Sequence, residues 1–231
     1  MAQKLIVEGE NDIHVISHLC LKKGISGIVG FEDETEYKNK FVSVAGGKSK
    51  VKQSLKLILK KKDSALKNIG IVLDADSETE NPAVDTWLSI RNILSSFGYE
   101  NLPETPNVLG TIVSQNGKPK VGIWIMPNNL EGGYLEHFFQ SILIENEEMW
   151  TESHEKIEAL VNTNRNRFSE IAKQKAKVHT WLAWQQKPEL AMGLALKEYN
   201  DSFDFNSQNV QNFFDWFTNT FDVNLKEVQV S

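Results

Sequence analysis

Short apolar runs alternate with amphipathic stretches through the first half of the chain. Apolar runs of strand length occupy residues 5–7, 41–44 and 69–73, and the third suits a strand that is covered on both faces. After the second run, apolar residues such as Val51 and Leu55 recur at helical spacing, and similar stretches follow the first and third runs. Strands that alternate with helices predict βαβ crossovers, so we expect an α/β fold with a mainly parallel sheet flanked by helices.

The pattern changes in the middle of the chain. Asn116-Gly117 separates two apolar runs, which is a strong hairpin signal, so one antiparallel strand is expected to join the sheet. Farther on, the helical periodicity predicts helices around residues 133–145, 152–162, 168–186, 188–199 and 208–221. We therefore expect two parts, an α/β domain over residues 1–140 and a C-terminal helical subdomain over residues 141–231 packed on it.

Aromatic residues are concentrated in the predicted C-terminal helices. They include Trp181, Trp184, Phe213, Phe214, Trp216 and Phe217. We interpret them as the apolar packing of the helical subdomain. A surface on which nucleic-acid bases stack is the alternative interpretation.

Composition limits the class of protein without naming a function. The 231 residues, 40% of them hydrophobic and 24% charged, suit an ordinary globular protein with a substantial core. The net charge of −6 means that a nucleic-acid partner would need a local basic patch. The single cysteine, Cys20, excludes an internal disulfide. No apolar run reaches the length of a membrane helix, and the start MAQKLIVEG lacks the features of a signal peptide. We expect a cytoplasmic protein with no membrane partner.

Two of the apolar runs end abruptly in acidic residues. Glu8 follows the first run, in the stretch KLIVEGENDI, and Asp74 and Asp76 follow the third, in NIGIVLDADSETE. In a parallel sheet the carboxyl ends of the strands share one edge, where ligands bind, and residues two apart on an extended segment point the same way. Carboxylates gathered there would repel one another, which a hard cation such as Mg²⁺ would relieve. The alternative is that these acids only mark the solvated ends of strands.

The two acidic motifs resemble those of TOPRIM domains, which occur in topoisomerases, bacterial primases, OLD-family nucleases and small stand-alone proteins. LIVEGENDI resembles their hydrophobic strand followed by Glu-Gly, and IVLDADSE resembles their strand followed by Asp-x-Asp. The resemblance covers about residues 4–140 and implies a TOPRIM-like sheet. It also implies that Glu8 is the general acid/base and a metal ligand, and that Asp74 and Asp76 hold Mg²⁺. Glu78 stands where some members of the family carry a third acid.

The later part of the chain narrows this resemblance. The stretches WIMPNNLEGGYLEHFF and KVHTWLAWQQKPELAMG resemble the small stand-alone TOPRIM-like proteins. A tyrosine-bearing breakage domain and zinc-ribbon cysteines are not visible in the sequence, which argues against a whole topoisomerase or primase.

Other oxygen-bearing side chains are candidates for secondary ligands. These candidates are Asp12, Glu78, Asn128, Glu131 and Glu136. The last three follow a predicted strand that would end at the same edge of the sheet. Two other roles fit this segment equally well, because Asn129 could cap a helix and Glu136 could lie on a solvated helix face.

A lysine-rich stretch, GGKSKVKQSLKLILKKK, is the best basic patch. Lys48, Lys52 and Lys56 recur every four residues, so they would share one helix face and could bind nucleic acid. The Gly-Gly corner before this helix could present backbone amides to a phosphate, although the spacing is not that of a P-loop. The solvated face of an amphipathic helix is the alternative.

Two functions are consistent with the sequence. The first is a Mg²⁺-dependent phosphoryl-transfer enzyme, best described as a nuclease acting on DNA or RNA, with Mn²⁺ as the alternative ion. The second is a non-catalytic module that binds a metal-nucleotide or a protein partner. The lysine-rich helix favours the first and the net acidity favours the second.

Overall fold

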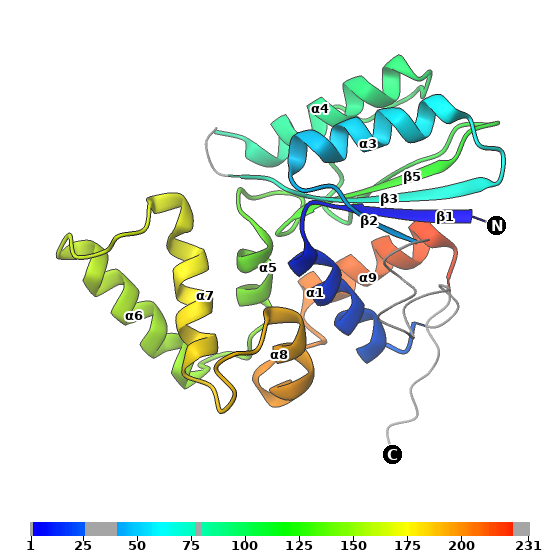
Figure 1. Cartoon of the computed structure of the whole chain (residues 1–231). Coiled ribbons are helices and arrows are strands. Elements are labelled where there is room, and N and C mark those ends of the chain that lie inside the picture. The colour runs from blue at the N-terminus through cyan, green and yellow to red at the C-terminus, as the bar shows by residue number, and fades with distance from the viewer. Residues whose placement is uncertain (1, 26–40, 77–79, 224–231) are drawn as a thin grey trace.

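The computed structural model describes residues 2–25, 41–76 and 80–223, and within them the chain builds one sheet with helices on both faces (Figure 1). The sheet has the strand order β2-β1-β3-β5-β4. Its strands are β1 (Ala2–Val7), β2 (Val42–Val44), β3 (Leu66–Asp74), β4 (Thr111–Val113) and β5 (Lys120–Met126). All neighbouring pairs are parallel except β4 with β5. The predicted α/β fold, with a mainly parallel sheet and one hairpin strand, is therefore confirmed.

The hairpin forms where the sequence predicted it. Gly117 adopts a φ of 76°, a left-handed conformation that glycine reaches without a steric penalty. The chain then returns as β5, which lies between β3 and β4 and is buried over almost its whole length. Burial of β5 on both faces explains its continuous apolar sequence.

Two helices cover each face of the sheet. On one face lie α3 (Lys48–Lys61) and α4 (Pro82–Ser96), and on the other lie α1 (Glu10–Lys22) and α9 (Gln208–Phe221) (Figure 1). Separate apolar clusters fill the two layers, one around Val51, Leu55 and Trp87, the other around Trp124 and Phe213. The sheet is therefore covered by an apolar layer on each face.

The remaining helices gather beside the carboxyl edge of the sheet (Figure 1). They are α5 (Leu135–Ser141), α6 (Glu148–Asn162), α7 (Lys173–Ala183) and α8 (Met192–Glu198), with short 3-10 turns η1 (Glu170–Ala172) and η2 (Asn200–Ser202). Ion pairs from Glu158 to Lys173 and Lys177 join α6 to α7. Within the described residues, no helix is long and apolar enough to cross a membrane.

The last helix, α9, packs directly on the sheet. A Cβ atom added to Gly70 would lie 2.4 Å from the ring of Phe221, and one added to Gly122 would lie 2.0 Å from the hydroxyl oxygen of Thr220. The two glycines therefore allow a close approach that any larger residue would block. As a result α9 shares one apolar core with β3 and β5. The boundary at residue 140 stays a prediction, but α9 is part of the layer that covers the sheet.

Most of the C-terminal aromatic residues are buried, as the packing interpretation predicted. Trp181, Phe213, Phe214, Trp216 and Phe217 are at most 1% exposed, and several of their rings meet edge-on or tilted. They are therefore not a surface for stacking bases. Trp184 is the exception in this set, because 41% of it is exposed.

Candidate functional site

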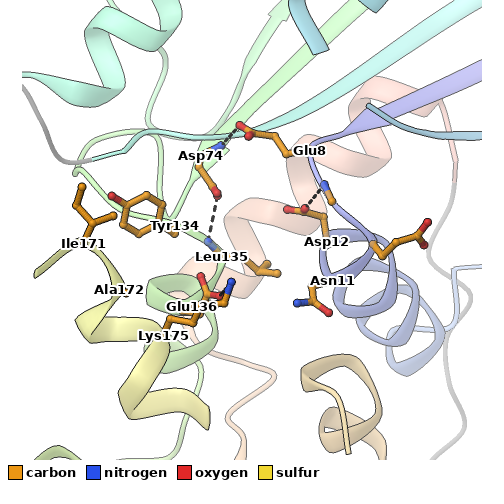
Figure 2. Close-up of a pocket in the computed structure, with 12 residues that line it drawn as sticks. Glu8, Asn11, Asp12, Asp74, Tyr134, Leu135, Glu136, Ile171, Ala172 and Lys175 are labelled. Carbon is orange, nitrogen blue, oxygen red and sulfur yellow. Dashed lines mark hydrogen bonds and ion pairs between the residues drawn. The ribbon is translucent and has the colours of Figure 1, made fainter. Parts of the chain in front are cut away.

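Two acidic residues meet at the carboxyl edge of the sheet. Strands β1 and β3 are parallel neighbours, with Ile6 opposite Ile71, so Glu8 and Asp74 emerge side by side. Glu8 Oε1 accepts a hydrogen bond of 2.9 Å from the backbone N–H of Asp74 (Figure 2). The proximity expected from the sequence is therefore present.

The Gly-Gly corner before α3 fixes the backbone of Glu8. Gly46 and Gly47 have φ angles of 80° and 114°, and both amides donate to the carbonyl oxygen of Glu8, at 2.8 and 3.1 Å. These two amides are thus engaged with the protein itself, which corrects the expectation that they would face a phosphate. Their role is to hold Glu8 against the start of α3.

Asp74 ties the sheet to α5. Its Oδ1 accepts a hydrogen bond of 3.1 Å from the backbone N–H of Leu135, in the first turn of α5. This bond brings the neighbouring Glu136 to the same edge, where its Oε1 lies 3.8 Å from Nζ of Lys175 on α7. These contacts therefore connect β1 and β3 with α5 and α7.

A pocket of about 550 Å³ opens between these elements. Its acidic lining consists of Glu8, Glu10, Asp12, Asp74 and Glu136, and the rest of the lining is Gly9, Asn11, Tyr134, Leu135, Ile171, Ala172 and Lys175. Figure 2 shows Asp12 and Asn11 on one side, Tyr134 and Ile171 on the other, and Glu8 and Asp74 at the sheet edge between them. We call this the acidic pocket.

Burial and mutual repulsion raise the pKa values of carboxyl groups in the acidic pocket. Burial, together with the charges of Asp12, Glu8 and Glu136, raises the pKa of Asp74 to about 9. Burial likewise raises the pKa of Asp12 to about 7, against the hydrogen bond of 2.8 Å that its Oδ2 accepts from Gly9 N–H. A group of carboxyls held so close favours either protons or a cation.

Burial also raises the pKa of Glu8, and three contacts act against it. The backbone amides of Asp74 and Lys48 donate toward its carboxylate, and the charge of the Lys48 side chain favours its ionised form. The pKa of Glu8 is therefore raised above its ordinary value, which moves the carboxyl toward the range in which a group can take up and give back a proton.

Asp76 departs from the prediction. It does not line the acidic pocket, and its carboxylate instead forms an ion pair of 2.5 Å with Nζ of Lys48, which also contacts Thr86 Oγ1 at 2.9 Å. The expectation that Asp74 and Asp76 would point the same way assumed an extended backbone. Asp76 has a φ of 66° and pairs with Gly133 in an antiparallel bridge, which ends the alternation.

The segment after β5 reaches the same edge through Tyr134, Leu135 and Glu136, and of the three candidates in this segment only Glu136 lines the acidic pocket. Asn128 and Glu131 bond to each other at 2.9 Å and line a separate pocket of about 250 Å³. Asn129 is not a helix cap, because its side chain accepts a hydrogen bond from Ile125 N–H and it is 1% exposed. Glu136 is 9% exposed, so the solvated helix face is wrong for this residue. Glu78 lies outside the described residues.

Coordination of a metal ion needs several ligand side chains that converge on one point. Among them, no group of three or more His, Cys, Asp or Glu side chains is arranged to hold a metal ion. The acidic pocket nevertheless offers several carboxylate oxygens, the donor type that Mg²⁺ prefers, and Mg²⁺ keeps several waters that can bridge to ligands. Its chemistry therefore suits a hydrated hard cation.

Comparison with known proteins assigns a family. The family described as "Protein of unknown function (DUF3226)" matches residues 2–222. The chain belongs to this family. No curated protein and no solved structure matches the chain. The DUF3226 match spans the sheet, α9 and all the elements that line the acidic pocket.

The three candidate lysines of α3 have different environments. Lys48 is engaged with Asp76, so its side chain lies at the site rather than on an open surface. Lys52 is partly exposed and Lys56 is exposed. With a rise of about 1.5 Å per residue, Lys56 lies ~12 Å along the helix from Lys48, so the exposed lysines lead away from the acidic edge.

Sequence reasoning missed the far wall of the acidic pocket. Tyr134, Ile171 and Lys175 line it, yet none was a candidate. Tyr134 belongs to a stretch that was compared with the TOPRIM-like proteins, and its position just before α5 was a usable signal. Ile171 and Lys175 lie about a hundred residues beyond Asp74 in the sequence, and no local pattern marks their approach to it.

Proposed function

We propose that this DUF3226 protein is a Mg²⁺-dependent nuclease that cleaves phosphodiester bonds in DNA or RNA. The observation that carries the proposal is the meeting of Glu8 and Asp74 at the carboxyl ends of neighbouring parallel strands, within one pocket that also holds Asp12 and Glu136. The sequence motifs at these strand ends resemble those of TOPRIM domains, which supports phosphoryl transfer over other chemistry. A parallel sheet also binds its ligands at this edge.

Mg²⁺ would be held by Asp74, with Glu8, Asp12 and Glu136 as further partners directly or through water; Mn²⁺ is the alternative ion. When bound, such an ion neutralises phosphate charge and polarises a phosphate oxygen. The raised pKa values of Asp74 and Asp12 support this assignment, because a cation would replace protons that these carboxyls hold without it. Asp76 would act at longer range, since Lys48 already pairs with it.

Glu8 would move the proton. A phosphodiester is cleaved when a hydroxyl or water attacks phosphorus while the leaving oxygen gains a proton, so one group must accept a proton and later return it. Glu8 keeps one oxygen on the Asp74 amide, which orients its carboxylate, and its pKa is raised by burial. Its other oxygen would serve the transfer.

The exposed part of the lysine-rich helix would steer the polyanion. Lys52 and Lys56 carry their charge outside the acidic pocket, where they can contact phosphates that flank the reacting one. A local patch of this kind is needed because the whole chain has a net charge of −6. We place the protein in the cytoplasm, on the basis that its single cysteine is buried and unpaired.

A non-catalytic module that binds a metal-nucleotide or a protein is the second candidate. The ion pair between Lys48 and Asp76 favours it, because one of the two predicted Asp ligands is engaged by the protein itself. Such a module would bind a nucleotide with Mg²⁺ and release it unchanged. Product analysis separates the two candidates.

The test is a cleavage assay on plasmid, single-stranded DNA and RNA, with Mg²⁺, with Mn²⁺ and with excess chelator. Wild type should cleave at least one substrate in a metal-dependent manner, and Glu8→Gln and Asp74→Asn should reduce the rate by a factor of about 100 or more. The matched control is Glu148→Gln, an exposed glutamate on α6, which should cleave normally. Equal rates for Glu8→Gln and wild type would overturn the proposal.

A further inference from the structure

The wall of the acidic pocket opposite α1 has a different chemistry from its floor. It is made by η1 and the first turn of α7, together with Tyr134 (Figure 2). Ile171 is an aliphatic residue that is 51% exposed at the rim of a charged pocket. Lys175 is the only basic residue among the described residues that line the pocket, and its side chain is 57% exposed.

Tyr134 gives this wall an aromatic face. Its ring lies 5.7 Å from the ring of His137, tilted by 37°, and the His137 Nδ1 accepts a hydrogen bond from Tyr134 N–H. The hydrogen bond orients the His137 ring, and the ring contact then restricts where the Tyr134 ring can lie. A restrained aromatic ring beside an exposed aliphatic side chain suits a flat, apolar group, and a nucleobase has that shape.

The positive charge of Lys175 lies on the same wall. Its Nζ is 3.8 Å from Glu136, so it remains near the carboxylates while its exposed side chain can turn toward a ligand. One wall thus combines a surface for a base with a cation for a phosphate, and the acidic floor lies between them and α1. A pocket of about 550 Å³ is of the size that holds one small ligand.

A pocket of this shape suits single-stranded nucleic acid better than a duplex. In a duplex the bases are stacked and paired inward, so a base can enter a pocket only after it is flipped out, which costs a few kcal/mol. An unpaired strand has splayed bases that stack on aromatic side chains without that cost. A phosphate at the floor of a pocket flanked by α1 and α7 is therefore more accessible on a flexible strand.

We propose that the wall formed by Tyr134, Ile171 and Lys175 binds one nucleotide unit of a single strand, so that the protein acts on single-stranded nucleic acid. The base lies against Tyr134 and Ile171, and a phosphate lies beside Lys175. This inference rests on the proposed nuclease function for its reaction. Its binding step stands on the wall itself and can be measured separately.

The test measures binding by fluorescence anisotropy with Ca²⁺, on a short labelled single strand and on a blunt duplex of the same sequence. The single strand should bind at least ten times more tightly than the duplex, and a mononucleotide should compete with it. Tyr134→Leu and Ile171→Asp should each weaken single-strand binding by a factor of about 5 to 100, whereas Tyr134→Phe should bind as wild type does. Ile144→Asp, at an aliphatic residue that is 41% exposed away from the pocket, is the matched control and should change nothing.

Lys175 is tested by the dependence of binding on salt. Lys175→Ala should flatten the slope of log affinity against log salt by about 0.7, the value for one phosphate contact with a single strand, and Lys175→Arg should restore it. Lys156→Ala, on the exposed surface of α6, should leave the slope unchanged. A slope unchanged in Lys175→Ala would remove the phosphate contact from this wall.

Cleavage measured in parallel separates the inference from the function on which it rests. Duplex bound and cut as well as the single strand would overturn the inference and leave the nuclease standing. If binding depends on Tyr134 and Ile171 but no substrate is cleaved, the proposed nuclease activity would be overturned and the proposed nucleotide-binding wall would be supported. Normal binding by both wall variants would overturn the inference whatever the cleavage result.

Discussion

Replacing Asp74 with asparagine should stabilise the metal-free protein above neutral pH. The ordinary pKa of this side chain is 3.8, and in the folded chain burial and the neighbouring carboxylates raise it to about 9. The unfolded chain is therefore ionised at pH 7 while the folded chain keeps its proton. Folding must take up that proton, so the stability of wild type falls as the pH rises from about 4 to about 9.

The size of this effect follows from the shift. A pH of 7 is about 3 units above the pKa of this carboxyl in the unfolded chain. Each unit corresponds to about 1.4 kcal/mol, so the protein loses at most about 4 kcal/mol of stability at pH 7. Asparagine removes this loss because it does not ionise, and its Oδ1 can still accept the hydrogen bond from Leu135 N–H. For a chain of this length, 1 kcal/mol shifts the melting temperature by about 2–4 °C.

Thermal melts of wild type and Asp74→Asn in chelator, at pH values from 5 to 8, measure the effect. The melting temperature of the variant should exceed that of wild type by several degrees at pH 8, and the difference should shrink toward pH 5. Asp215→Asn, at an exposed aspartate of α9, is the matched control and should show no such trend. A difference that is absent at pH 8, or that does not grow with pH, would refute the electrostatic account of the acidic pocket.

Other substitutions test the fold, the basic helix and the proton-transfer group. Gly122→Ala places a Cβ 2.0 Å from a hydroxyl oxygen of α9, so it should lower the free energy of unfolding in urea by about 1–3 kcal/mol. Lys52→Glu combined with Lys56→Glu should weaken nucleic-acid binding and flatten its salt dependence, because a protein that contacts fewer phosphates releases fewer counterions when it binds. Lys48→Met removes a charge that favours ionised Glu8, so the pKa of Glu8 should rise and the acid limb of the cleavage profile should move to higher pH.

Each of these results has a clear opposite. An unchanged urea midpoint for Gly122→Ala would mean that α9 does not need its close approach to β5. Binding that keeps its full salt dependence after both lysine changes would return α3 to the solvated-face interpretation. A cleavage profile that does not move in Lys48→Met would separate Lys48 from the ionisation of Glu8.

The sequence predicted the sheet and its acidic edge because both are expressed in local patterns. Apolar runs that end in Glu8 and Asp74, separated by helical stretches, imply parallel strands whose carboxyl ends coincide. The hairpin followed from Asn116-Gly117, whose turn needs a positive φ. These inferences depend only on residues that lie close together in the sequence, so local patterns were sufficient to make them.

The orientation of Asp76 was not predictable in the same way. Its left-handed φ of 66° accompanies a bridge to Gly133, which is more than fifty residues away. The approach of Ile171 and Lys175 to the pocket similarly depends on how α7 packs against α5 and α6. Long-range packing decides which side chains share a pocket, and a single sequence carries no direct record of it.

Isothermal titration of Mg²⁺ into wild type and Asp74→Asn tests the central claim most directly. We expect wild type to bind Mg²⁺ with release of protons, because the ion displaces them from carboxyls whose pKa values are raised. Asp74→Asn should lose most of this affinity, whereas Asp76→Asn should lose less, since Lys48 holds Asp76 outside the acidic pocket. Equal Mg²⁺ affinity in wild type and Asp74→Asn, or no binding by wild type, would contradict the assignment of the acidic pocket as a metal-dependent active site.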